Sequence, residues 1–137
     1  MKKTFVFAVF LLCSGPAFAD DTLFTDMGGK AGIDRLVDEV EKIYLDDPRI
    51  KETFAESNLE RLNTKLKEDF CVVAGGPCTY TGHSMEEAHR GLGLRNFDFN
   101  ALVEDLQLAM DKVRIPFAVQ NRFLARLAPM QHQVVTK

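Results

Sequence analysis

The segment of the chain with the clearest chemical content is Met85–Leu94, MEEAHRGLGL, which contains His89. On an α-helix, the residues four before, one before and three after a histidine share its face, and here these are Met85, Ala88 and Leu92. Imidazole is polar and titrates near neutral pH, so on an apolar face it needs a partner. His89 is therefore the residue whose chemistry has to be explained.

Several kinds of partner are compatible with His89. The simplest is a backbone carbonyl that satisfies a buried histidine. A catalytic role has less support, because no Ser, Cys or Asp stands at a spacing typical of a catalytic triad. A zinc site also has less support, because it would need three or four ligands and only His83 is nearby. Haem needs a single protein ligand on an apolar helical face, because its iron accepts one imidazole nitrogen while a carbonyl holds the other. The residues alone leave a satisfied core histidine and a haem ligand open.

Apolar periodicity predicts an all-α domain of about five helices around this segment. The first stripe ends at Pro48 and contains Ile33, Leu36, Val37, Val40 and Tyr44. The second contains Leu59, Leu62, Leu66, Phe70 and Val73. The Met85 segment is the third helix, the fourth stripe runs from Phe99 to Val113, and the fifth begins near Pro116 and runs from Phe117 to Val134.

Glycine and proline predict where the helical pattern is interrupted. Gly75-Gly76-Pro77 should end the second helix, with glycine just past the end and proline after it. Between the second and fourth helices, about twenty residues hold further glycines and little regular pattern. A long irregular segment in a small domain is usually functional, so we expect the site here.

The N-terminus predicts export. Lys2-Lys3 is followed by the short apolar run Thr4–Leu12 and by the cleavage pattern Ala17–Ala19, which together indicate a signal peptide over residues 1–19. Residues 20–137 are then expected to form a single domain in a periplasmic or secreted protein. The apolar run is well short of the roughly 20 residues that cross a bilayer, so no membrane insertion is expected.

Charge and cysteine usage narrow the partners further. Removing two lysines with the signal peptide changes the formal net charge from −3 to −5, and an acidic chain without basic clusters argues against nucleic acid as a partner. Cys71 and Cys78 remain, and a cysteine pair in an oxidising compartment is most simply a disulfide. The CxxC spacing of a redox dithiol and the CxxCH spacing of covalent haem attachment are both absent.

Four motifs together resemble a known family. They are LFTDMGG with Gly28-Gly29, LDDPRIKETF ending in Phe54, AGGPCTYTG with Tyr80, and MEEAHRGLGL. In this order and spacing, over Thr22–Val134, the chain resembles the group 1 truncated haemoglobins. The resemblance implies a truncated globin-like fold, with helices stacked two-over-two around one haem b per chain. The cysteine pair that flanks GGP is similar to that of an exported subset of the family.

The resemblance also implies roles for individual residues. His89 matches the proximal ligand of the haem iron, and Phe54 matches the phenylalanine that packs against the porphyrin. Phe70 falls where some members have a phenylalanine that gates an apolar tunnel for small gases. The full set of implied cofactor-binding residues is Phe54, Leu62, Lys65, Leu66, Phe70, Tyr80, Met85, Leu92, Leu94 and Phe99. Plain core packing is the other interpretation of the apolar members from 62 to 70.

The expected distal pocket, formed by Val40, Glu41 and Tyr44, departs from the family pattern. Most members have Phe-Tyr where this chain has Val40-Glu41, and the tyrosine hydroxyl donates a hydrogen bond to the bound ligand. Glu41 could donate only if burial kept it protonated; otherwise it turns outward or pairs with Lys65. Tyr44 lies one helical turn further on, so it could supply the missing hydroxyl only with a backbone shift.

Lys65 has two interpretations. In some relatives the side chain at the matching position binds iron as a sixth ligand, and a lysine amine could do so because burial lowers its pKa. The other interpretation is a solvated lysine on the flank of the helix, with its aliphatic stem against the haem edge.

The function implied by the resemblance is reversible binding of oxygen or another diatomic gas, such as nitric oxide, at the iron held by His89. Nitric oxide dioxygenation is a further implied activity, and it would need a separate electron donor. The missing tyrosine keeps an alternative open, namely electron transfer or sensing with a six-coordinate iron. A second alternative is a haem-free helical module in which the cysteine pair does redox work or the apolar stripes meet a partner.

Overall fold

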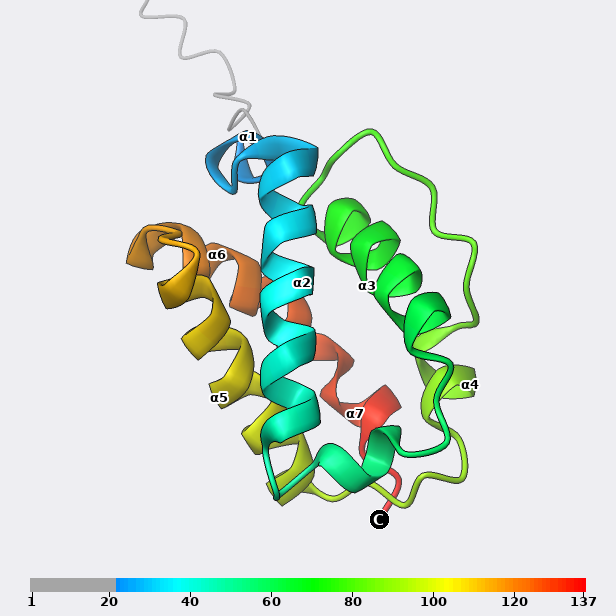
Figure 1. The fold of residues 1–137 in the computed structure, drawn as a ribbon. Coiled ribbons are helices and arrows are strands. Elements are labelled where there is room, and N and C mark those ends of the chain that lie inside the picture. The colour runs from blue at the N-terminus through cyan, green and yellow to red at the C-terminus, as the bar shows by residue number, and fades with distance from the viewer. Residues whose placement is uncertain (1–21) are drawn as a thin grey trace, which may run out of the picture.

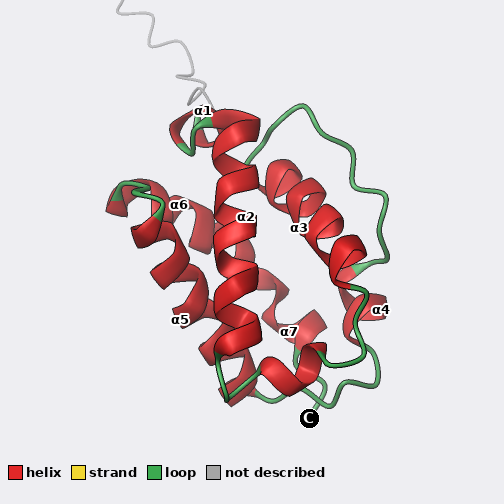
Figure 2. Ribbon diagram, in the orientation of Figure 1, coloured by secondary structure: helices red, strands yellow, loops and turns green. Residues whose placement is uncertain are grey.

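A computed structural model describes residues 22–137, so the predicted signal peptide lies outside the described residues. Helices and connecting loops make up the described part, which contains no strand (Figure 2). The α-helices are α1 (Leu23–Asp26), α2 (Gly29–Asp46), α3 (Leu59–Val73), α4 (Met85–His89), α5 (Asn96–Lys112), α6 (Phe117–Leu127) and α7 (Gln131–Val134). Two short 3-10 helices are η1 (Lys51–Phe54) and η2 (Ala128–Met130). The all-α prediction is confirmed.

The central element is α2, which lies between α5 and α3, with α6 and α7 behind it (Figure 1). Its apolar residues recur every three or four positions, which is the period of one helix face. That face is buried as predicted, at Ile33, Leu36, Val37, Val40 and Tyr44. The helix ends before Asp47, whose extended backbone suits a residue that precedes proline.

The end of α3 is fixed by its glycines, as predicted. Gly75 has a φ of +83°, and its N–H donates to the carbonyl of Val72 at 2.9 Å. The N–H of Gly76 donates to the carbonyl of Cys71 at 2.8 Å, which completes a Schellman motif. A Cβ at Gly76 would lie 2.5 Å from the Phe24 ring, so α1 can close over this turn only because position 76 is glycine.

Two elements differ from the predicted pattern. The sequence pattern does not indicate α1, because four residues are too few to show a helical period, yet Leu23 is fully buried there. The fifth predicted helix is divided into α6, η2 and α7. Pro129 lies in the 3-10 turn, where it cannot donate the backbone hydrogen bond that a continuous α-helix needs.

The hydrophobic core lies where α2, α5 and α6 meet. Phe123, Leu106 and Met110 are at most 1% exposed there. Phe70 reaches this core from α3 and meets Phe123 edge to face, with ring centroids 5.2 Å apart. In the part of the chain that the structure describes, no helix is long and apolar enough to cross a membrane.

Candidate cofactor site

His89 is positioned by the short helix α4. The helix begins at Ser84, whose Oγ accepts a hydrogen bond from the Glu87 N–H at 3.2 Å. The Glu87 carboxylate accepts one in return from the Ser84 N–H at 3.1 Å, which completes a capping box. These bonds lower the pKa of Glu87, with the backbone bond from Ser84 as the largest cause. The cap fixes the start of α4 and so places His89 one turn after Met85.

The imidazole of His89 is oriented by the carbonyl of Met85. The distance from His89 Nδ1 to the Met85 oxygen is 2.7 Å. A carbonyl oxygen only accepts hydrogen bonds, so Nδ1 carries the proton and, in a neutral ring, Nε2 keeps its lone pair. The predicted carbonyl partner is present, and it leaves Nε2 in the form that a metal ion binds.

The residues predicted to line a cofactor fall into groups with different exposure. Leu94 and Phe70 are buried. Seven others are half-buried, namely Phe54, Leu62, Lys65, Leu66, Tyr80, Met85 and Phe99. Leu92 is 47% exposed. These partly covered apolar side chains, together with a single imidazole, fit a flat apolar ring such as haem.

The three predicted distal residues are all engaged elsewhere. Val40 is fully buried in the core. The Tyr44 hydroxyl donates to the Leu102 carbonyl at 3.4 Å, its ring stacks on Phe54 with centroids 5.7 Å apart, and burial raises its pKa. Glu41 accepts a hydrogen bond from the Asn63 amide at 2.5 Å. Of the alternatives that the sequence left open, the pairing of Glu41 with Lys65 is not formed, and the tyrosine hydroxyl is engaged by Leu102.

Lys65 is held by the loop that leads to α4. Its Nζ lies 3.0 Å from the Glu68 carboxylate and donates a hydrogen bond to the Thr81 hydroxyl. The Thr81 N–H donates to the same carboxylate at 2.9 Å, and this bond is the largest cause of the lowered pKa of Glu68. The Lys65 amine is therefore bound by Glu68 and Thr81 at the side of α3.

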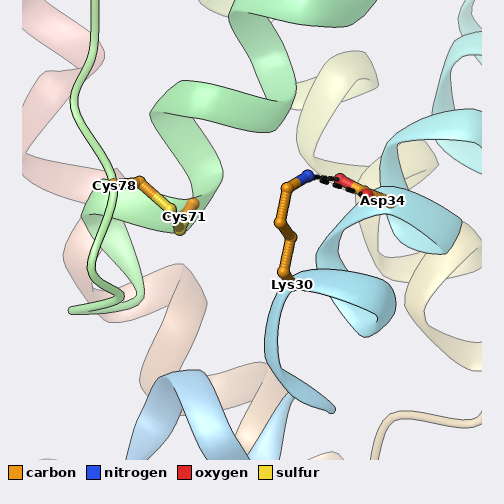
Figure 3. The surroundings of a disulfide bond; sticks show 4 residues. All are labelled: Lys30, Asp34, Cys71 and Cys78. Carbon is orange, nitrogen blue, oxygen red and sulfur yellow. Dashed lines mark hydrogen bonds and ion pairs between the residues drawn. A yellow bond between two sulfur atoms is a disulfide. The ribbon is translucent and has the colours of Figure 1, made fainter.

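Cys71 and Cys78 anchor the other end of this loop. Their Cα atoms are 6.0 Å apart and their sulfur atoms lie at bonding distance, a geometry that is compatible with the predicted disulfide. Figure 3 shows the sulfurs joining α3 to the loop, with the Lys30–Asp34 ion pair of α2 nearby. From Cys78 the chain runs back alongside α3 to α4 (Figure 1). The loop is thus held to α3 at two places, by the cysteines and by Thr81.

Sequence analysis missed one residue of this region, Asp69. It lies on α3 at offsets of seven from Leu62 and three from Leu66, so the three residues share a helix face. Burial raises the pKa of Asp69, and its electrostatic interaction with His89 acts in the opposite direction. Asp69 is also one of the charges that raise the pKa of Tyr80, after burial of the phenol itself. The carboxyl group therefore lies among the predicted cofactor-binding residues.

Comparison with known proteins places this arrangement in context. A family model described as bacterial-like globin matches residues 22–136. The chain is 36% identical to a group 1 truncated haemoglobin of Tetrahymena thermophila over 69% of its own length and 78% of the relative. It is 33% identical to the group 1 truncated haemoglobin of Tetrahymena pyriformis, over 73% and 83% of the two chains.

The fold is also similar to solved structures. The truncated haemoglobin of Tetrahymena pyriformis, in its Fe(III) form, superimposes with a TM-score of 0.81 at 25% identity. The match covers 84% of this chain and 98% of that one. A variant of the same protein gives a TM-score of 0.82 at 26% identity. The helices described above therefore form a truncated globin fold.

Proposed function

The chain belongs to the bacterial-like globin family, and from this premise we propose that it is a truncated haemoglobin that binds haem and a diatomic gas. The observation that carries the proposal is the geometry of His89. Its Nδ1 is protonated and held by Met85, so Nε2 is available to an iron ion. Haem supplies an iron atom with an open coordination position for oxygen, nitric oxide or carbon monoxide.

The residues proposed to hold one haem b come from both sides of the region between α3 and α4. His89 is the proposed proximal ligand, and Met85 orients it. Leu62 and Leu66 supply apolar surface from α3, and Phe54 supplies an aromatic ring that is braced by Tyr44. The remaining proposed contacts are Lys65, Phe70, Tyr80, Leu92, Leu94 and Phe99.

Gas binding is favoured over a role that needs a sixth protein ligand. Lys65 would have to leave both Glu68 and Thr81 before its amine could approach a metal. Binding is also favoured over oxygen-dependent turnover, because the Glu41 carboxylate is held by Asn63 and the Tyr44 hydroxyl by Leu102. Neither group is free to donate a hydrogen bond to a ligand.

The test is absorption spectroscopy of purified protein supplied with haem. Wild type should show a strong Soret band with one haem per chain, and carbon monoxide should shift the band of the reduced protein. His89→Ala should lose the band or move it to that of free haem, and added imidazole should restore a bound spectrum. His132→Ala, which removes an exposed histidine, is the control and should behave as wild type. An unchanged spectrum in His89→Ala would refute the assignment.

We also propose that the mature protein is exported and begins at Asp20, with residues 20–137 as one domain. The support is the basic, apolar and small-residue order of residues 1–19 and the cysteine pair that an oxidising compartment would join. Intact mass of protein recovered from the periplasm or medium tests this proposal. A retained N-terminus or a purely cytoplasmic product would contradict it.

A further inference from the structure

Asp69 stands on an otherwise apolar face of α3. At 100° per residue, Leu62, Leu66 and Asp69 all point within about 60° of one another. The face thus carries two leucines and then a carboxyl group. Lys65 lies on the flank of this face, and its amine pairs with Glu68 at 3.0 Å and not with Asp69.

The other carboxylate near this region is directed differently. Asn63, which holds Glu41, is one residue from Leu62 and so is turned about 100° away from the Leu62 face. The same Asn63 amide donates to Asp38 at 3.1 Å, and Lys67 pairs with Asp38 at 2.7 Å. Glu41 therefore belongs to a polar seam between α2 and α3.

Asp69 has electrostatic neighbours on the side where the cofactor is proposed to bind. The two side chains that sense its charge are the imidazole of His89 and the phenol of Tyr80. Both stand outside α3, on the loop and helix that follow Cys78. Asp69 therefore lies on the same face of α3 as Leu62 and Leu66, which are proposed haem contacts, and its electrostatic neighbours are on α4 and on the loop before it.

We propose that the Asp69 carboxylate makes this site select uncharged ligands over anions. The proposal rests on the haem-binding function proposed above and adds the class of ligand that the site accepts. A fixed negative charge in a poorly solvated region repels an anion strongly, because little water screens it. It has little effect on carbon monoxide, which carries no charge and gains little charge on binding.

The test compares two ligands of the haem-loaded protein at pH 8, where we expect Asp69 to be ionised. Sodium azide is titrated into the ferric form and carbon monoxide into the ferrous form, with absorption as the readout. At an effective dielectric constant of about 20, the repulsion between two unit charges within one pocket corresponds to about tenfold or more in affinity, so removing the charge should tighten azide binding by about that factor. Asp69→Asn should therefore bind azide more tightly and carbon monoxide with unchanged affinity.

A second variant and a matched control separate charge from shape. Asp69→Leu removes the same charge but restores an apolar side chain, so it should also bind azide more tightly. Glu60→Gln removes one charge from an exposed position in the first turn of α3 and should change azide affinity by less than twofold. The midpoint potential is an independent readout, and it should rise in both Asp69 variants because a nearby anion favours ferric over ferrous iron.

Each result decides between the two proposals. If the wild type binds no haem, the proposed function fails. If it binds haem normally but both Asp69 variants have wild-type azide affinity and midpoint potential, the proposed function stands and the Asp69 proposal is refuted. An equal gain in azide and carbon monoxide affinity would also refute the Asp69 proposal. Such a result would mean that the substitution makes the iron easier for any ligand to reach, whatever the charge of the ligand.

Discussion

The α2–α5–α6 side of the molecule and the α3–α4 side bury their residues to different extents. On the first side, Phe123, Leu106 and Met110 are at most 1% exposed. On the second, apolar side chains such as Leu62 and Leu66 are only half-buried. Burial of apolar surface is the main source of folding free energy, so the first side holds the fold together. The second presents apolar surface that a bound ring would cover.

Each side also contains an aspartate in an unfavourable setting. Asp105 of α5 is 5% exposed, its Oδ2 has no hydrogen-bond partner, and Arg49 approaches its other oxygen at 3.6 Å. Asp69 of α3 instead has the imidazole of His89 and the phenol of Tyr80 as electrostatic neighbours. We therefore expect Asp105 to act on the stability of the fold, whereas Asp69 is proposed to act on which ligands bind.

The largest expected effect comes from truncating one residue on each side. Phe123→Ala should lower the free energy of unfolding by about 3–5 kcal/mol, because it opens a cavity in a fully packed core. Leu66→Ala should cost about 1 kcal/mol in haem-free protein, since part of that side chain is already in water. Urea unfolding followed by circular dichroism measures both. Similar costs for the two variants would contradict the division into a structural side and a binding side.

A smaller effect is expected from the cysteine pair on the α3 side. Replacing both residues, as Cys71→Ser with Cys78→Ser, should cost about 2 kcal/mol, because a short loop in the unfolded chain is no longer closed. The free energy of unfolding of the wild type should fall by the same amount in a dithiol reductant. That of the double variant should be the same with and without the reductant. Thiol titration supplies the independent check. Two free thiols in protein recovered from an oxidising compartment would contradict the pairing.

The smallest expected effect concerns the pH dependence that Asp105 gives to the α5 side. Burial, and after it the charge of Asp47, raises the pKa of Asp105 to about 6. The folded state therefore holds this proton more tightly than the unfolded state, so stability should fall as pH rises from about 4 through about 6. Asp105→Asn should remove this contribution and be about 1 kcal/mol more stable than wild type at pH 7.5.

Urea unfolding at pH 4.5 and pH 7.5 checks the sign of the Asp105 effect. The increase in the free energy of unfolding caused by Asp105→Asn should be larger at pH 7.5 than at pH 4.5. Glu60→Gln removes an exposed carboxylate and should change the free energy of unfolding by less than about 0.5 kcal/mol at both pH values. A gain that is larger in acid would mean that Arg49 dominates and that the Asp105 carboxylate is favourable where it stands.

Sequence reasoning predicted the parts of the molecule that depend on local periodicity. The buried face of α2 and the glycine end of α3 follow from offsets along one helix, and a carbonyl partner for His89 is expected without the residue that supplies it. The partner of Glu41 could not be found in this way, because Asn63 meets it across two helices. The hydrogen bond from the Thr81 N–H to the Glu68 carboxylate likewise depends on how the loop after Cys78 runs back beside α3.

Asp69 could have been found from the sequence. Its offsets from Leu62 and Leu66 place it on the same helix face, and a carboxyl group there breaks the apolar pattern. The motif comparison instead drew attention to Phe70, the next residue, which the structure buries against Phe123. What no offset could supply is the proximity of Asp69 to His89 and Tyr80, because that depends on the return of the chain through α4.

The brevity of α4 has a consequence for how the protein acquires its cofactor. A five-residue helix has almost no intrinsic stability, so α4 depends on the Ser84 cap and on its packing against α7. Such a segment opens at a small fraction of the cost of unfolding the core. We therefore expect α4 to open while the other helices stay assembled, so that His89 would become accessible without global unfolding.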